Sequence, residues 1–327
     1  MPRITNIYLY GALTILLFYG FFFQYLLGGS VTKAEGKEVI VIDEGASLKE
    51  ISETLMHAGL VRSSRAFTLL GILAGDANRL RPGRYTFKGT ERGSTILRVL
   101  VKGPQVKTIV IPEGSTLLEI DAILANANII ESGAFTTLSA DLFSEQFPFL
   151  KGDSLEGYLF PDTYAFVEGE SVEKIVEEFL VTFKKKALPL FKEPTVMYNK
   201  LILASILEKE VVSQTDRRIV AGILEKRIAQ GIPLQIDATV IYAKCKAFKG
   251  CDTLTKSDFS IKSPINTYRV SGLPPQPIGN PGLTAIEAAL HTQSSPYLYY
   301  LSDPKTGKTI FSKTFAEHDE NRAFYLR

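Results

Sequence analysis

The stretch ASILEKEVV, residues 204–212, determines how the C-terminal half of the chain is interpreted. Residues 201–207 are apolar almost throughout, as in a helix packed on all sides, and Glu208 and Glu210 then appear where packing should continue. A carboxylate buried without a partner costs several kcal/mol, so such a group is paired, exposed or used in chemistry. On a helix the two glutamates point about 200° apart, so they cannot both face one cleft.

Small neighbours favour Glu208 as the glutamate that faces a ligand. Ala204 and Ser205 lie on the same helical stripe as Glu208, and they leave room above it for a ligand or another stretch of backbone. The alternative is that both glutamates are exposed where the helix reaches the surface, with Lys209 between them. The residues alone leave this alternative open.

A second feature is the segment SPINTYRVSGLPPQPIGNPG, residues 263–282, whose proline and glycine content excludes regular structure. A long irregular segment inside a compact domain usually lines a site, although a surface lid without a ligand is the alternative. Its Asn266, Tyr268 and Asn280 carry amide and phenol groups that suit the hydroxyl and acetamide groups of a sugar.

The stretch LEGYLFPDTY, residues 155–164, adds aromatic rings and carboxylates. Tyr158 lies near Glu156 and Asp162, and aromatic faces beside carboxylates suit a sugar, whose ring has apolar C–H faces and a belt of hydroxyl groups. For Asp162, and for Asp237 in the stretch GIPLQIDATVIYA, capping of a turn or a short helix is the simpler explanation from the residues alone.

The N-terminal half contains an internal repeat. Residues 39–67 realign with residues 108–135, and each copy predicts a β-branched strand, a Glu-Gly turn, an N-cap at Ser47 or Thr116, and an amphipathic helix. Between the copies, RPGRYTF predicts a turn and a strand, and a short helix is expected from Ser94. By themselves such units indicate a binding or spacing module rather than an enzyme.

The rest of the chain predicts a mixture of helices and strands. The expected elements are a helix from Ser171 to about Lys186, the helix that contains Glu208, a helix over about 215–230, helices that begin with capping boxes of Thr284 with Glu287 and of Thr314 with Glu317, and a β-hairpin between those two. The predicted fold class is therefore α+β.

Composition and charge argue against some functions. The chain has 327 residues and a formal net charge of only +2, without a basic stripe interleaved with aromatic residues, which argues against nucleic-acid binding. Three histidines and two cysteines do not supply a credible metal site, and we expect no cofactor. Cys245 and Cys251 predict either a disulfide that closes a small loop or two free thiols.

The N-terminus predicts a transmembrane anchor. Residues 4–32 carry no charged side chain, and residues 7–27 supply the roughly 20 apolar residues that a bilayer core requires. A cleaved signal peptide is the alternative, but its apolar region is usually shorter. Because Arg3 precedes the span, we expect a single pass through the cytoplasmic (inner) membrane, with residues 33–327 on its outer side.

Five motifs together resemble those of the endolytic murein transglycosylases, the YceG-like or MltG family. They are ASILEKEV, LEGYLFPDTY, GIPLQIDATVIYA, SPINTYRVSGLPPQPIGNPG and the closing YLYYL, in the family's order and at similar spacing over essentially the whole chain. The chain departs from the family pattern at Ala238, where members often have proline, and at Gln276 or Gly279. These departures affect the local backbone rather than the expected chemistry.

The resemblance implies a domain organisation and a set of site residues. It implies a cytoplasmic tip and anchor over 1–32, a LysM-like subdomain over 33–103, and a catalytic domain over 104–327 that includes a second LysM-like unit at 108–135. The family's catalytic glutamate is the first of its EKE motif, which is Glu208 here, and Glu210 is expected to matter less. The expected substrate-binding residues are Glu156, Tyr158, Asp162, Gln235, Asp237, Asn266, Tyr268 and Asn280.

The implied activity is lytic cleavage of peptidoglycan within its glycan strands. The β-1,4 bond between N-acetylmuramic acid and N-acetylglucosamine is broken, and a 1,6-anhydro end is left, with one carboxyl acting first as acid and then as base. We expect apolar surroundings to keep the Glu208 carboxyl partly protonated at neutral pH.

Two other functions fit the residues. The first is a hydrolytic muramidase in which Glu210, Asp237 or Glu156 is the second carboxylate. The second is a scaffold that binds the cell wall without catalysis, through the repeated N-terminal units. The resemblance also implies partners among murein synthases and the proteins of elongation or division.

Overall fold

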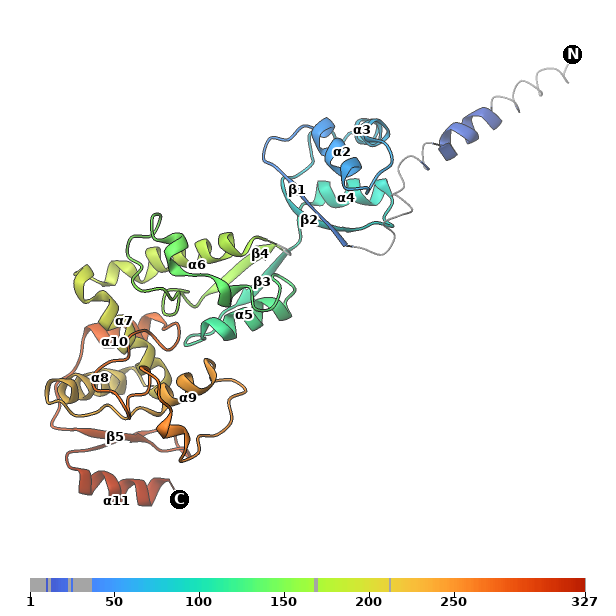
Figure 1. Cartoon of the computed structure of the whole chain (residues 1–327). Coiled ribbons are helices and arrows are strands. Elements are labelled where there is room, and N and C mark those ends of the chain that lie inside the picture. The colour runs from blue at the N-terminus through green and yellow to red at the C-terminus, as the bar shows by residue number, and fades with distance from the viewer. Residues whose placement is uncertain are drawn as a thin grey trace, which may run out of the picture. The chain divides into compact units, whose positions relative to one another are not determined.

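The computed structural model describes residue 10, residues 13–22, residue 25, and residues 37–167, 170–211 and 213–326 (Figure 1). The chain forms two compact units. One comprises Met1–Lys107 with Ala165–Glu170, and the other comprises Thr108–Tyr164 with Ser171–Arg327.

The predicted membrane span, residues 7–27, lies partly outside the described residues. Within it, residues 13–22 are helical, and large apolar side chains such as Leu16 and Phe21 are exposed. Among the residues that the structure describes, no helix is both long and apolar enough to cross a bilayer.

Residues 37–102 of the first unit combine a two-stranded antiparallel sheet with three helices. Its elements in chain order are β1 (Lys37–Ile42), α2 (Leu48–His57), α3 (Ser64–Leu73), β2 (Gly83–Lys88) and α4 (Gly93–Lys102). Ile40 and Ile42 are buried, whereas Val39 and Val41 are 45% and 53% exposed. This alternation shows that one face of the sheet packs on the core.

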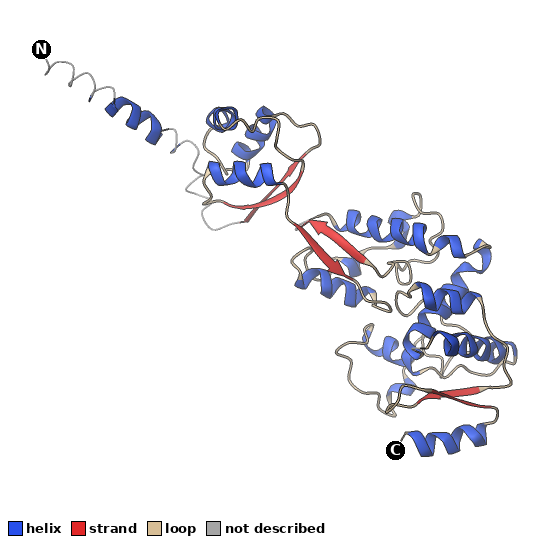
Figure 2. Ribbon diagram, turned by 180° about the vertical axis from the view of Figure 1, so that it is seen from behind, coloured by secondary structure: helices blue, strands red, loops and turns tan. Residues whose placement is uncertain are grey.

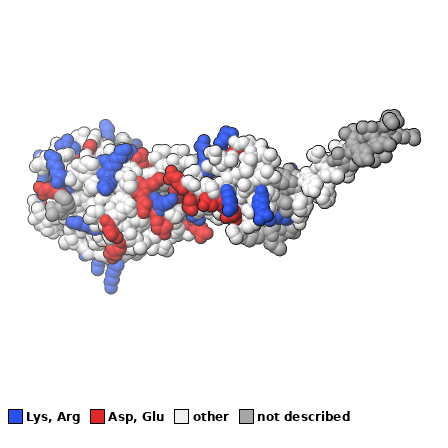
Figure 3. Space-filling view, turned by 90° about the horizontal axis from the view of Figure 1, so that it is seen from above, with Lys and Arg blue, Asp and Glu red and all other residues white. Residues whose placement is uncertain are grey.

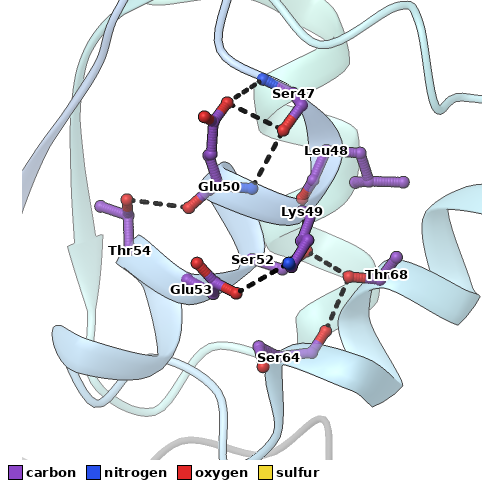
Figure 4. Close-up of polar contacts among 9 residues, drawn as sticks. All are labelled: Ser47, Leu48, Lys49, Glu50, Ser52, Glu53, Thr54, Ser64 and Thr68. Atoms are coloured by element: carbon purple, nitrogen blue, oxygen red, sulfur yellow. Dashed lines mark hydrogen bonds and ion pairs between the residues drawn. The ribbon is translucent and has the colours of Figure 1, made fainter.

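The helices of the internal repeat begin as the sequence predicts. At α2, the Glu50 N–H donates to Ser47 Oγ (3.3 Å) and the Ser47 N–H donates to the Glu50 carboxylate (2.7 Å) (Figure 4). Thr116 and Glu119 form the same reciprocal pair of bonds at the start of the second helix. Both N-cap predictions are therefore confirmed.

The second unit is mixed α and β. Its elements are β3 (Val106–Val110), α5 (Leu117–Asn126), β4 (Thr163–Val167), α6 (Val172–Lys186), α7 (Pro194–Glu210), α8 (Gln214–Ala229), α9 (Asp237–Cys245), α10 (Leu283–Leu290), β5 (Tyr299–Ser302), β6 (Thr309–Ser312) and α11 (Phe315–Tyr325). The unit boundary falls within β3 and within β4, so part of each of these strands belongs to the first unit. β3 pairs with β4, and β5 pairs with β6 in the predicted antiparallel hairpin. Each sheet that the described residues form thus has only two strands, set among helices (Figure 2).

The core of the second unit is built around α7. Residues 201–207 are each at most 2% exposed, which confirms the prediction of a helix packed on all sides. α8 and α10 pack against it (Figure 1). The last turn of α7, which follows this packed stretch, is less buried and carries Glu208 and Glu210.

The predicted capping box of Thr284 with Glu287 is wrong. The N-cap of α10 is Gly282, and no side chain caps that end. The Thr284 hydroxyl is instead used by a partner from another helix, since it accepts a hydrogen bond from the Arg217 guanidinium at 2.6 Å. At α11 the predicted capping box is half present: Thr314 Oγ1 accepts from the Glu317 N–H, but the Glu317 carboxylate accepts from the Lys313 N–H instead of the Thr314 N–H.

The prediction of an irregular segment is confirmed, and the choice left open for the two cysteines is resolved. Residues 263–282 contain no helix or strand. Cys245 and Cys251 are joined by a disulfide, which closes the small loop that follows α9.

Charged side chains of both signs occur on the surface. On the face that Figure 3 draws, Asp and Glu gather toward the middle and Lys and Arg are scattered among uncharged residues. This mixture agrees with the formal net charge of +2.

The two capping boxes allow a matched stability test. Thr116 is buried and Ser47 is exposed. When the hydroxyl is removed, water can replace it as the acceptor for the Glu50 N–H but not for the buried Glu119 N–H. We expect Thr116→Ala to lower the free energy of unfolding by about 1–2 kcal/mol in urea denaturation of the full chain. Ser47→Ala is the control and should cost less; an equal or greater loss for Ser47→Ala would contradict this reasoning.

Candidate active site

The last turn of α7 places its two glutamates in different surroundings. Glu208 is buried in an ion pair, since Arg217 Nη2 donates to Glu208 Oε1 at 2.6 Å and the side chains are only 9% and 6% exposed, respectively. The other oxygen, Glu208 Oε2, accepts from the Gly282 N–H at 2.9 Å. Both oxygens of this carboxylate are therefore bound inside the protein.

Arg217, which the sequence analysis did not single out, connects three helices. Besides Glu208, its guanidinium donates to Val211 O at the end of α7 and to Thr284 Oγ1 on α10, both at 2.6 Å. Arg217 itself lies on α8. The ion pair thus fixes the end of α7 against α8 and α10.

A third charged group faces the same ion pair. The pKa of Glu113, in the turn before α5, is raised by partial burial and by the nearby negative charge of Glu208, and it is lowered in part by Arg217. The surroundings of Glu208 are therefore charged, not apolar as the sequence led us to expect.

Glu210 lines a cavity of about 860 Å³ on the other side of the helix. Its carboxyl accepts a hydrogen bond from the Tyr300 hydroxyl on β5 at 3.2 Å. Loss of hydration and, secondarily, the negative charge of Asp237 raise the pKa of Glu210 to about 7. A carboxyl with this pKa is protonated part of the time at neutral pH and can both give and take a proton.

Three of the predicted substrate-binding residues line the same cavity. They are Gln235, Asp237 and Tyr268. Asp237 is the first residue of α9, and it accepts a hydrogen bond from the Tyr268 hydroxyl at 2.6 Å. Gln235 has a left-handed backbone (φ 51°), and its N–H donates to Thr267 O at 3.2 Å. The irregular segment therefore does contribute to the cavity, through Tyr268.

Glu156 and Asn280 lie elsewhere and bind each other. The Glu156 carboxylate accepts from the Leu117 N–H (3.0 and 3.2 Å), the Tyr242 hydroxyl (2.8 Å) and Asn280 Nδ2 (3.0 Å). Burial raises the pKa of Glu156 to about 7. It lines a separate cavity of about 570 Å³ and is only 2% exposed, so it holds loops together at the start of α5.

The remaining predicted contacts are also used within the protein. The buried Tyr158 hydroxyl accepts from the Lys151 N–H at 3.0 Å, and Asp162 pairs with Lys186. Asn266 Nδ2 donates to two carbonyl groups, at 3.1 and 2.9 Å. We therefore leave these three residues, with Glu156 and Asn280, out of the candidate site.

The cavity also contains residues that the sequence analysis missed, above all Arg227, Tyr299 and Tyr300. One signal was present in the sequence of α8. Arg217 and Arg227 fall on its buried stripe together with Val220 and Leu224, where apolar residues are expected. A buried arginine in such a stripe requires a partner or a ligand.

In the described part of the chain, no group of three or more His, Cys, Asp and Glu side chains could hold a metal ion. Both cysteines are in the disulfide.

Comparison with known proteins assigns the chain to a family. The model of the YceG-like family matches residues 40–323. The chain belongs to the YceG-like family. Its mixed α+β fold with small sheets agrees with a YceG-like protein of known crystal structure from Listeria monocytogenes, which has a TM-score of 0.58, 30% identity, and coverage of 88% of this chain and 99% of that one.

Two similar family relatives are named endolytic murein transglycosylase. The protein from Streptococcus pneumoniae is 29% identical over 347 residues, which cover 94% of this chain and 62% of that protein. The protein from Bacillus subtilis is 29% identical over 316 residues, which cover 88% of this chain and 84% of that protein. The chain thus spans less than two thirds of the streptococcal relative.

The Glu208–Arg217 pair gives a test by double-mutant cycle. Arg217→Met leaves the Glu208 carboxylate buried without its cation, and we expect a loss of about 3–5 kcal/mol in the free energy of unfolding. The double variant Glu208→Gln/Arg217→Met should recover part of this loss, because it buries no uncompensated charge. Additive losses in urea denaturation would show that the two groups do not stabilise each other.

Proposed function

We propose that this protein is a lytic transglycosylase that cleaves peptidoglycan within its glycan strands, with Glu210 as the group that transfers the proton. The principal support is one observation: Glu210 lines a cavity beside Asp237 and has a pKa of about 7. Membership of the YceG-like family and the names of the two relatives support the substrate class.

The proposed reaction needs a single acid that later acts as a base. Neutral Glu210 gives its proton to the glycosidic oxygen as the bond to C1 of N-acetylmuramic acid breaks. The Glu210 carboxylate then takes the proton of the C6 hydroxyl, whose oxygen bonds to C1 and forms the 1,6-anhydro ring. No water is consumed, and Glu210 regains its starting state.

Two neighbours of Glu210 have supporting roles in this scheme. Tyr300 donates to the Glu210 carboxyl at 3.2 Å and so orients it. Asp237, held by Tyr268 at 2.6 Å, supplies a negative charge beside the position where positive charge develops on the sugar ring.

This proposal moves the proton-transferring role from Glu208 to Glu210. Glu208 was the candidate on the sequence pattern and the family motif, but Arg217 and the Gly282 N–H bind both of its oxygens. Because these partners engage both oxygens inside the protein, Glu208 is less well placed than Glu210 to meet a glycosidic oxygen. The assignment between the two is tested below.

A hydrolytic reaction is a second candidate because Glu210 and Asp237 line one cavity. Glycosidases use two carboxylates in this way, and Asp237 would be the nucleophile or the base. The products separate the candidates, since a hydrolytic product is heavier by one water than the anhydro product.

We also propose that the N-terminal apolar segment anchors the protein in the cytoplasmic membrane, with the second unit on the outer side. The support is the uncharged stretch of residues 4–32. Murein synthases and proteins of elongation or division are the proposed partners, on family resemblance alone.

Two single variants decide between the glutamates. Glu210→Gln removes the acid and should lower the release of anhydro products from peptidoglycan by at least about 100-fold, measured by mass spectrometry. Glu208→Gln keeps that acid, so it should retain more activity than Glu210→Gln if thermal unfolding shows that it is folded. An inactive, folded Glu208→Gln variant beside an active Glu210→Gln variant would return the role to Glu208.

The pKa of Glu210 predicts the pH dependence. Because the protonated acid starts the reaction and its pKa is about 7, kcat/KM should fall about tenfold per unit above pH 7. Asp237→Asn removes a negative charge that raises this pKa, so the decline of kcat/KM with rising pH should begin at a lower pH. Asp162→Asn, which changes a carboxylate outside the cavity, is the control. If kcat/KM of Asp237→Asn declined at the same pH as that of wild type, the assignment would be contradicted.

A further inference from the structure

Arg227 is a buried cation without a carboxylate partner among the described residues. It is 6% exposed and lines the cavity that contains Glu210. Its hydrogen bonds go to neutral acceptors, since Nη2 donates to Pro233 O and, at 3.5 Å, to Gln235 Oε1. Its Nε is buried and has no hydrogen-bond partner in the described part of the chain.

The energetics of this arrangement point to an anionic ligand. Burial of an ionised group without an opposite charge is costly, and arginine cannot avoid the cost by losing its proton. Burial lowers the pKa of Arg227, which is the expected sign of this penalty. An anion that entered the cavity would offset the cost and would satisfy the open donor capacity of the guanidinium.

The charge balance of the cavity points the same way. Its described lining contains the cations Lys209, Arg227 and Arg322, and the carboxylates Glu210 and Asp237. Glu210 must be neutral at the start of the proposed reaction, which leaves Asp237 as the negative charge. Lys209 lies 3.9 Å over the Phe248 ring, and the carboxylates that act on it, Glu119, Glu208 and Glu156, lie outside this lining, so Arg227 and Arg322 are the cations left to the cavity.

Arg227 and Glu210 line the same cavity. Tyr300, which donates to the Glu210 carboxyl, also interacts electrostatically with Arg227. A ligand that reaches both groups needs an anionic substituent on, or next to, the sugar whose bond Glu210 protonates. Muramic acid has such a substituent, because its 3-O-lactyl group ends in a carboxyl that is free in stripped strands and carries the stem peptide in intact ones.

We propose that Arg227 binds a carboxylate carried by the muramyl 3-O substituent, either the free lactyl carboxylate or a carboxylate of the stem peptide. This proposal rests on the proposed function. It adds that the protein distinguishes glycan strands by the carboxylates that their muramyl residues carry. Charge-assisted hydrogen bonds to arginine are among the stronger ones in proteins, so the carboxylate should contribute mainly to substrate binding.

A purely structural role for Arg227 makes a different prediction. By binding Pro233 O and Gln235, Arg227 also holds the loop that precedes α9. If that were its whole role, its loss would weaken the reaction with every strand to the same extent. The substrate comparison below separates the two roles.

The test compares four strand preparations with the full-length protein. Strands stripped of stems by an amidase and strands with intact stems are each used with free carboxylates and with carboxylates converted to methylamides. For wild type we expect kcat/KM to be about 10–100-fold lower on methylamidated strands than on free strands, because KM rises. This loss should appear with the type of strand, stripped or intact, that carries the recognised carboxylate. For Arg227→Gln the same conversion should change kcat/KM less than about threefold, with Arg227→Lys between the two.

The controls keep the result interpretable. Arg322→Gln removes another cation of the cavity, one that already lies 3.8 Å from Asp319, and should respond to the methylamides as wild type does. Two results would overturn the proposal. The first is a wild-type kcat/KM that does not change on methylamidation of either stripped or intact strands. The second is an Arg227→Gln variant that loses the same activity on free and on methylamidated strands.

Failure of the proposed function is recognised separately. It would appear as an absence of anhydro products from every strand with wild type. In that case calorimetric binding of free and converted strands to Glu210→Gln still tests the carboxylate site, since this measurement needs no turnover. Equal affinity for free and converted strands would reject the site.

Discussion

The buried ion pair between Glu208 and Arg217 fixes the part of the fold on which the candidate site depends. Arg217 binds Glu208 and Val211 O at the end of α7 and reaches Thr284 on α10, each at 2.6 Å. A helix end usually frays because its last carbonyl groups lack partners. Here the clamp holds the final turn in place, and Glu210 belongs to that turn.

The same turn separates two carboxyl groups by environment. Glu208 is bound by the Arg217 guanidinium, whereas Glu210 meets a hydroxyl, loses hydration and has a pKa of about 7. A raised pKa alone does not identify a catalytic group, because Glu156 also has a pKa of about 7 and is held by four hydrogen bonds to three donor groups. Both groups line a cavity that contains a second carboxylate, but Glu156 is only 2% exposed and its two oxygens are taken by these bonds, whereas Glu210 is partly exposed.

The sequence predicted much of the fold and part of the site. Local signals were sufficient for the N-caps Ser47 and Thr116, for the packed stretch 201–207 and for the hairpin, because each depends on neighbouring residues. Gln235, Asp237 and Tyr268 were found through their motifs. The choice of Glu208 failed to anticipate its partner, because Arg217 lies nine residues away on the next helix and its contact depends on how α7 and α8 pack.

The most direct test of the account is a carbon-13 NMR titration of the glutamate side-chain carboxyl groups in the full-length protein. The signal that disappears in Glu210→Gln identifies this residue and separates it from Glu156. The account predicts that this signal titrates at about pH 7. Titration near the ordinary glutamate value of about 4.3 would contradict it, because the carboxyl would then hold too little proton at neutral pH to act as the acid.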